Sequence, residues 1–132
     1  MRTYTRYATQ MPVELTLDTM EIEEETLVGI GYGGMQIVSD IPLSKGSKVN
    51  FRFPEVDPNY SAIGEVRWCH KASDHYDVGV EFTHRDEDLT QSLVEQIYYI
   101  ESMRNSATRQ GQVLSVGEAA ERWRNDSGLN HH

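Results

Sequence analysis

Two arginines near the start of the sequence, Arg2 and Arg6, have the type and spacing to bind an anion. They are the only cations between residues 1 and 44, a stretch that otherwise carries acidic side chains. A guanidinium presents a rigid fork of N–H donors that can bind an anionic group through two hydrogen bonds at once. Such contacts are local, so they can form even on an acidic protein. The pair therefore indicates a small anionic ligand.

Three glycines, Gly29, Gly31 and Gly34, reproduce the G-x-G-x-x-G pattern of dinucleotide-binding loops. That pattern binds a phosphate only where a strand precedes it and a helix follows it. Here residues 35–41 are rich in β-branched side chains and end at Pro42, which predicts a strand and a turn. The context excludes a nicotinamide site. We expect the glycines to allow close approach of a different ligand, with at least one in a tight turn or bulge at positive φ.

The remaining residues with reactive or metal-binding side chains are Cys69, His70, His75 and His84. They lack the paired short spacings of zinc sites and fall near predicted strand ends and a turn. No Ser/His/Asp set and no pair of carboxylates stands out on a loop. The sequence therefore predicts a protein that is not an enzyme and holds no resident metal or cofactor.

Length and composition limit the classes of protein further. A chain of 132 residues can bury one core, and its single cysteine excludes an internal disulfide framework. No apolar run approaches the roughly 18 residues that cross a bilayer, and no secretory signal is present, so a cytoplasmic protein without a membrane partner is expected. The net charge of −9 argues against sequence-independent binding to DNA or RNA.

Alternation of apolar and polar residues predicts a mainly β protein. Trp68 has the same parity as Val66, which predicts that it packs in the core, and Glu21–Glu25 is expected to form a solvated hairpin apex. Short strands separated by turns, without helices between them, favour an antiparallel barrel or sandwich. The six predicted strands cover residues 13–18, 26–30, 35–38, 49–53, 61–70 and 76–82.

After residue 85 the apolar period becomes helical. A long helix is predicted over 86–104, followed by a polar linker over 105–112 and a short helix that begins at the capping box Ser115–Glu118. We therefore expect a β domain over 1–84 and a helical extension over 85–132 within the same compact unit, with a frayed tail from about residue 125. The long helix is expected to lie on the barrel through a stripe of four apolar residues, Leu89, Leu93, Ile97 and Ile100.

Residues 2–84 resemble the PilZ domain, the bacterial receptor module for cyclic di-GMP. The resemblance rests on Arg2-x-x-x-Arg6, on residues 29–34 at the place of the family's Asp/Asn-x-Ser-x-x-Gly motif, and on two closing strands around residues 64–68 and 76–82. It implies a six- or seven-stranded antiparallel β-barrel followed by C-terminal helices. It also implies a role in bacterial second-messenger signalling, with motility or biofilm formation among the outputs of such families.

The resemblance assigns ligand contact to five residues: Arg2, Arg6, Gly29, Gly31 and Gly34. In the family the two arginines lie on a flexible arm that closes on the nucleotide, where they can bind phosphate or the O6 and N7 atoms of guanine. This chain departs from the motif, because Gly29 replaces Asp or Asn and Gly31 replaces Ser. Losing both hydrogen bonds to guanine corresponds to a weakening on the order of a hundredfold.

The resemblance leaves two functions open. The first is a non-enzymatic module that binds cyclic di-GMP and, when its arginine arm becomes ordered, changes the surface shown to an unidentified protein partner. The second is an adaptor that has lost its nucleotide and acts by protein contact alone, which the two glycines favour. Either protein is expected as a monomer or a small homo-oligomer, and Tyr98 and Tyr99, off the apolar stripe, are candidates for a partner surface.

Overall fold

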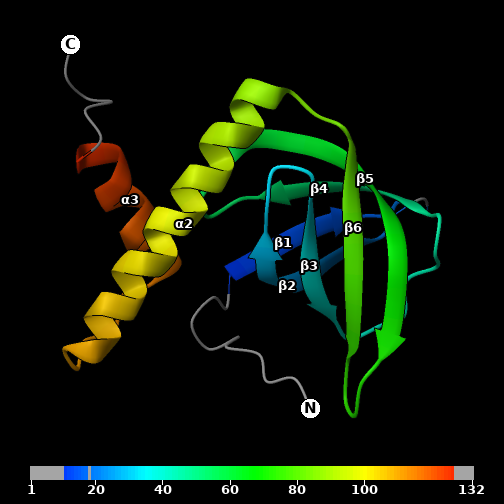
Figure 1. Ribbon diagram of the computed structural model, residues 1–132, viewed down its shortest axis with the longest axis horizontal. Coiled ribbons are helices and arrows are strands. Elements are labelled where there is room, and N and C mark those ends of the chain that lie inside the picture. Colours follow the sequence, from blue (N-terminus) through cyan, green and yellow to red (C-terminus); the bar gives the residue numbers. More distant parts are fainter. Residues whose placement is uncertain (1–10, 18, 127–132) are drawn as a thin grey trace.

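The computed structural model describes residues 11–17 and 19–126, which Figure 1 shows as a β-barrel with two helices at one side. Six antiparallel strands close the barrel in the order β1-β2-β3-β6-β5-β4. The predicted antiparallel barrel with one long and one short C-terminal helix is confirmed. The elements are β1 (Met11–Thr16), β2 (Ile22–Ile30), β3 (Gly34–Ser39), β4 (Lys48–Phe53), β5 (Asp57–Lys71), β6 (Tyr76–His84), α2 (Glu87–Arg109) and α3 (Val116–Asp126).

Alternating burial along the strands builds the barrel core. In β1 the side chains of Met11, Val13 and Leu15 are fully buried, whereas the residues between them are partly exposed. Aromatic rings occupy the interior, where Phe51 stacks on Phe82 with ring centroids 4.9 Å apart. Period-2 burial of this kind lets one face of each strand remove apolar surface from water, which stabilises the closed sheet.

The barrel is sealed where β1 pairs with β4. Three residue pairs form this seam: Glu14 with Arg52, Leu15 with Phe51 and Thr16 with Asn50. The guanidinium of Arg52 lies 3.1 Å from the carboxylate of Glu14 and also donates to the carbonyl oxygen of Pro58 at 3.1 Å. Because the sheet closes on itself, no strand of the barrel is left as a free edge along its whole length.

Helix α2 follows β6 directly and covers one part of the barrel. The carboxylate of Asp86 caps it by accepting a hydrogen bond from the amide of Leu89 at 2.9 Å. In its first turn, Thr90 faces the barrel and its hydroxyl lies 2.8 Å from that of Tyr60, whereas Leu89 is 54% exposed. The predicted apolar stripe is therefore wrong at Leu89 and correct at its other three positions, which are fully buried: Leu93, Ile97 and Ile100.

The helical extension differs from the prediction in one boundary. Helix α2 continues to Arg109, so residues 105–109 of the predicted linker are helical. The helix ends at Arg109 with Gln110 as its C-cap, and Gly111 follows with a positive φ of 77°, which suits a residue without a side chain. The capping box is confirmed, because Ser115 Oγ accepts from the amide of Glu118 at 3.0 Å and Glu118 Oε1 accepts from the amide of Ser115 at 2.9 Å.

The acidic stretch Glu21–Glu25 is not a solvated apex. Strand β2 already begins at Ile22, and Glu25 is only 5% exposed. Its carboxylate accepts hydrogen bonds from Ser39 Oγ at 3.0 Å and from the amide of Asp40 at 3.3 Å. The prediction failed because a carboxylate with neutral donors across the sheet can be buried despite its charge. Burial raises the pKa of Glu25, and the two hydrogen bonds counteract part of that rise.

Glu25→Gln is expected to remove a pH dependence of stability. Since the pKa of Glu25 is higher in the folded state, the folded protein binds this proton more tightly than the unfolded chain does. Its stabilising contribution is therefore present at low pH and lost as the pH rises through the folded pKa. Urea unfolding near pH 4.5 and at neutral pH should show wild type losing stability relative to the variant as the pH rises. Glu24→Gln, at an exposed neighbour, is the control, and equal pH profiles for wild type and Glu25→Gln would contradict the prediction.

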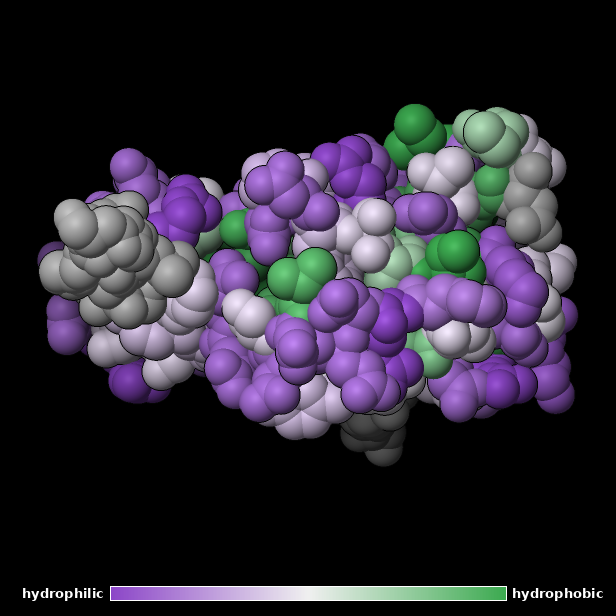
Figure 2. Space-filling model, turned by 90° about the horizontal axis from the view of Figure 1, so that it is seen from above, coloured by the Kyte–Doolittle hydropathy of each residue, from purple (hydrophilic) through white to green (hydrophobic). Residues whose placement is uncertain are grey.

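The surface is largely polar. Figure 2 shows one face on which hydrophobic residues form small patches between hydrophilic ones. This pattern agrees with the net charge of −9 and with the concentration of apolar side chains inside the barrel. Within the described residues, neither helix combines the length and apolar character that a membrane-spanning helix requires.

Candidate functional site

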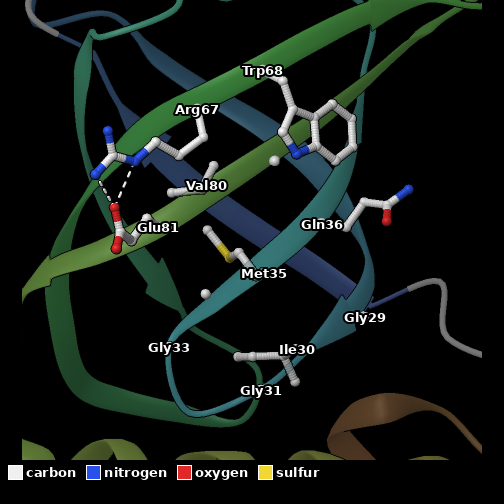
Figure 3. Close-up of a pocket in the computed structure, with 12 residues that line it drawn as sticks. Gly29, Ile30, Gly31, Gly33, Met35, Gln36, Arg67, Trp68, Val80 and Glu81 are labelled. Atoms are coloured by element: carbon white, nitrogen blue, oxygen red, sulfur yellow. Dashed lines mark hydrogen bonds and ion pairs between the residues drawn. The ribbon is translucent and has the colours of Figure 1, made fainter.

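An open pocket of about 450 Å³ lies where the β2–β3 turn meets strands β5 and β6. Figure 3 shows its twelve lining residues, which come from all four of these strands and from the turn. Three predicted site residues, Gly29, Gly31 and Gly34, line this one pocket. The other two, Arg2 and Arg6, lie outside the described residues. The remaining lining residues are Ile30, Gly33, Met35, Gln36, Arg67, Trp68, Gly79, Val80 and Glu81.

Gly34 owes its identity to the packing of two strands. A Cβ atom at this position would lie 2.5 Å from the carbonyl oxygen of Val80 on β6, closer than any side chain allows. The turn is held to the same strand by a hydrogen bond of 2.9 Å from the amide of Phe82 to the carbonyl oxygen of Gly33. The expectation of positive φ among the site glycines is wrong, because the described glycines with positive φ are Gly46 and Gly111.

Gly29 and Gly31 differ from Gly34 because they border empty space. A Cβ atom at either position would have no neighbouring atom within 4 Å, and the same holds for Gly33. Larger side chains at these positions would extend into the pocket without displacing the barrel.

Trp68 lies in the pocket and not in the core, contrary to the prediction. The pairing of β5 with β6 shifts register between Val66 and Trp68, so the extra residue Arg67 reverses the parity of the strand. Beyond this bulge Cys69 packs against the core and Trp68 faces outward. The indole covers Gly79, where a Cβ atom would overlap the ring.

The partly exposed ring of Trp68 belongs to a small aromatic surface. Its ring stacks with that of His70, with centroids 5.0 Å apart and planes inclined by 28°. Flat aromatic surfaces at the rim of an open pocket suit the stacking of a nucleobase. This position of Trp68 could not be predicted, because the parity of Trp68 is readable from the sequence whereas the bulge is not.

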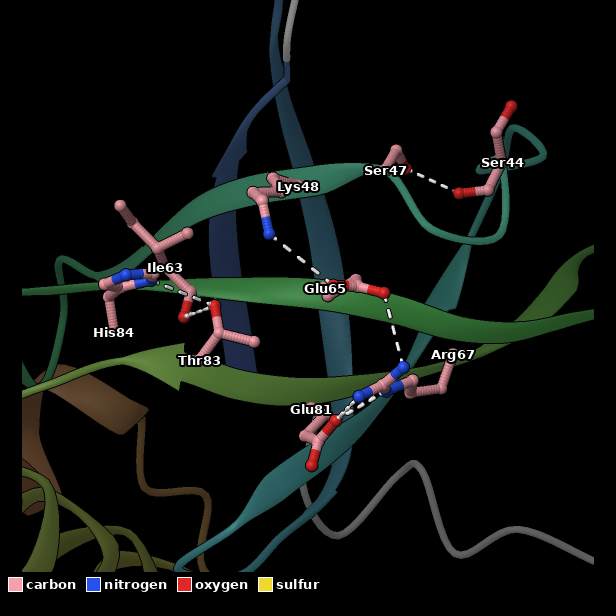
Figure 4. A network of polar contacts seen from close by, with 9 residues as sticks. All are labelled: Ser44, Ser47, Lys48, Ile63, Glu65, Arg67, Glu81, Thr83 and His84. Carbon is pink, nitrogen blue, oxygen red and sulfur yellow. Dashed lines mark hydrogen bonds and ion pairs between the residues drawn. The ribbon is translucent and has the colours of Figure 1, made fainter.

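Arg67 places a positive charge in the pocket, but its guanidinium forms ion pairs with two carboxylates. Its guanidinium is paired with Glu81, its neighbour in the pocket, and lies 3.3 Å from Glu65, which in turn lies 3.5 Å from Lys48. Figure 4 shows this chain of contacts across β4, β5 and β6. The hydrogen bond and charge of Glu81 raise the pKa of Arg67, so the guanidinium stays charged. Arg67 was not among the predicted site residues.

The histidines and the cysteine do not form a metal site in the described residues. No group of three or more His, Cys, Asp or Glu side chains there is placed to bind a metal ion. His75 contacts carboxylates instead, with Nδ1 2.7 Å from Asp74 and Nε2 3.3 Å from Asp77. These contacts lie at the β5–β6 turn and contribute no residue to the pocket.

Comparison with known proteins connects this geometry to a family. A family model described as the PilZ domain matches residues 1–99. No curated protein matches the chain. Among solved structures, the K. pneumonia MrkH–c-di-GMP complex is 15% identical with a TM-score of 0.57, and the match covers 82% of this chain and 52% of that chain.

Two further structures resemble the chain. The Bacillus subtilis inhibitor of motility, MotI/DgrA, is 19% identical with a TM-score of 0.52, over 74% of this chain and 50% of that one. The Borreliella burgdorferi PlzA protein in complex with c-di-GMP is 12% identical with a TM-score of 0.49, over 67% of this chain and 33% of that one. This chain thus spans about half, or less, of the structures that it resembles.

Proposed function

Because this chain belongs to the PilZ domain family, we propose that it is a receptor for cyclic di-GMP that performs no catalysis. The observation that carries the proposal is the position of the pocket. It opens at residues 29–34, which the resemblance aligns with the family's second ligand motif. No atom lies within 4 Å of the place where a Cβ atom would stand at Gly29 or Gly31, so a ligand has room beside these residues. The similar MrkH structure is described as a complex with this nucleotide, which supports the choice of ligand.

Two elements share the work of binding. Arg2 and Arg6 supply guanidiniums for the phosphates or for guanine, since both are acceptors for a bidentate arginine. The pocket supplies a surface for a base, with the indole of Trp68 at one side and the glycine turn at the other. Binding orders the residues around the two arginines and thereby changes the surface that a protein partner meets.

Isothermal titration of the purified protein with cyclic di-GMP tests the proposal. A dissociation constant in the low micromolar range or tighter supports the receptor. Cyclic di-AMP carries the same charge and differs in its bases, so it should bind more weakly if guanine is recognised. Absence of heat up to millimolar ligand overturns the proposal.

Trp68→Ala is expected to weaken binding by about tenfold. Stacking of one base on an aromatic side chain contributes roughly 1–3 kcal/mol, and each 1.4 kcal/mol corresponds to tenfold in affinity. The side chain is only partly buried, so its removal should leave the barrel folded. Trp68→Phe keeps an aromatic face and should retain most of the affinity. Equal affinities for wild type and the alanine variant would show that no base stacks here.

A second function has a specific observation in its favour. Gly29 and Gly31 remove the two polar side chains with which the family binds guanine. A PilZ domain without these groups could act as an adaptor that contacts a protein partner without nucleotide. The titration separates the two functions, because the adaptor gives no heat with cyclic di-GMP at any concentration tested.

A further inference from the structure

A side chain of helix α2 forms a hydrogen bond to the end of β2, next to the turn that borders the pocket. Tyr98 Oη donates a hydrogen bond of 2.6 Å to the carbonyl oxygen of Ile30, the last residue of β2. Within residues 11–17 and 19–126, the pairing of β1 with β2 extends to Leu27, opposite Met11. The carbonyl of Ile30 therefore lies beyond the β1–β2 ladder, and a phenol from α2 satisfies it there. A backbone acceptor with no partner in such a position would be costly.

The two ends of this contact differ in rigidity. Tyr98 follows Ile97, which is fully buried against the barrel and holds this part of α2 in place. The ring of Tyr98 itself is half-exposed, and its hydroxyl is the group that contacts the backbone of Ile30. Residues 31–34, by contrast, include three glycines, which leave the backbone unusual freedom. The hydroxyl of Tyr98, on a well-packed helix, thus forms a hydrogen bond next to the flexible turn at residues 31–34.

The contact completes a set of anchors on both sides of the turn. Gly31 donates its amide to the carbonyl oxygen of Gly34 at 2.9 Å, and the carbonyl oxygen of Gly33 accepts from Phe82 on β6. These two bonds hold the β3 side of the turn. The hydrogen bond from Tyr98 to Ile30 holds the β2 side, where Gly29 and Gly31 face the pocket.

We propose that Tyr98 is a positioning residue of the nucleotide pocket, an inference that rests on the proposed function. Its hydroxyl restrains the glycine turn before the ligand arrives, so less conformational entropy is lost on binding. The same bond links occupancy to the helix. Coupling between two sites is reciprocal, so the free energy by which the hydrogen bond favours ligand binding equals the free energy by which the bound ligand stabilises the hydrogen bond to Tyr98.

Tyr98→Phe in the full chain tests this role, because it removes the hydroxyl and keeps the ring. Without ligand, hydrogen exchange in a peptide covering residues 29–35 should become about fivefold faster, the effect of one neutral hydrogen bond, while peptides from β5 stay unchanged. Affinity for cyclic di-GMP should fall by about fivefold, and the melting temperature should fall by only a few degrees, as expected for one neutral hydrogen bond. Tyr99→Phe, the same chemical change one residue along α2, is the control.

The outcomes separate this inference from the proposed function. If wild type gives no heat with cyclic di-GMP, the receptor proposal fails, and the exchange experiment still decides whether Tyr98 restrains the turn. Unchanged exchange over residues 29–35 in Tyr98→Phe overturns the inference. It is equally overturned if exchange becomes faster and affinity stays that of wild type, since the hydroxyl would then serve the fold alone.

Discussion

Replacing Arg2 and Arg6 together by alanine is expected to weaken cyclic di-GMP binding by at least about a hundredfold. A hydrogen-bonded contact with a charged group contributes about 1.5–3 kcal/mol, so two lost arginines correspond to about 3–6 kcal/mol, and each 1.4 kcal/mol is tenfold. The pocket offers little compensation, because its own cation, Arg67, is engaged by Glu81 and Glu65. Isothermal titration at one fixed salt concentration measures the loss.

The matched control removes the same charge elsewhere. Arg109→Ala combined with Arg122→Ala takes two guanidiniums from the helices, neither of which lines the pocket. If the control variant binds like wild type and the first variant does not, the effect comes from local contacts and not from net charge. Equal loss in both variants would contradict a specific role for the N-terminal arginines.

Gly29→Asp combined with Gly31→Ser is expected to tighten cyclic di-GMP binding on the order of a hundredfold. The double substitution restores the polar groups that the family presents to guanine, at about 1 kcal/mol for a neutral hydrogen bond and 1.5–3 kcal/mol for a charged one. Space is available, since a Cβ atom at either position has no neighbour within 4 Å. Fewer glycines also reduce the entropy lost when the turn becomes ordered.

Gly33→Ser is the control for this gain. It adds a hydroxyl to the same turn, again with no atom within 4 Å of the new Cβ, but at a position that the family motif leaves unspecified. Its affinity should stay near that of wild type. A double variant that binds no better than wild type would mean that the pocket does not receive guanine in the orientation we propose.

The barrel could be predicted from the sequence because its determinants are local. Alternation in β1, such as buried Val13 and Leu15 around partly exposed Glu14, results from the period of an extended chain. The capping box at Ser115 is equally local, and both of its hydrogen bonds are present. The three glycines were assigned to one ligand site through the family resemblance, and they line one pocket.

The features that the sequence could not predict depend on contacts between distant residues. One inserted residue at Arg67 moved Trp68 from the core to the pocket, and a register shift leaves no mark in the sequence of a single strand. Glu25 is buried because Ser39, at the end of the neighbouring strand, and Asp40, the residue after it, donate hydrogen bonds to its carboxylate. The role of Tyr98 likewise depends on Ile30, 68 residues earlier in the chain.

The seam between β1 and β4 has a consequence for the order in which the protein folds. Its ion pair joins residues 38 positions apart, Glu14 and Arg52, whereas β5 and β6 are linked by a turn of a few residues. Closing a longer loop costs more chain entropy, so we expect the hairpins to assemble first and the seam to close last. Under mildly denaturing conditions we expect the β1–β4 seam to open first. The unpaired backbone edges of these two strands would then be exposed, and self-association of the protein would begin there.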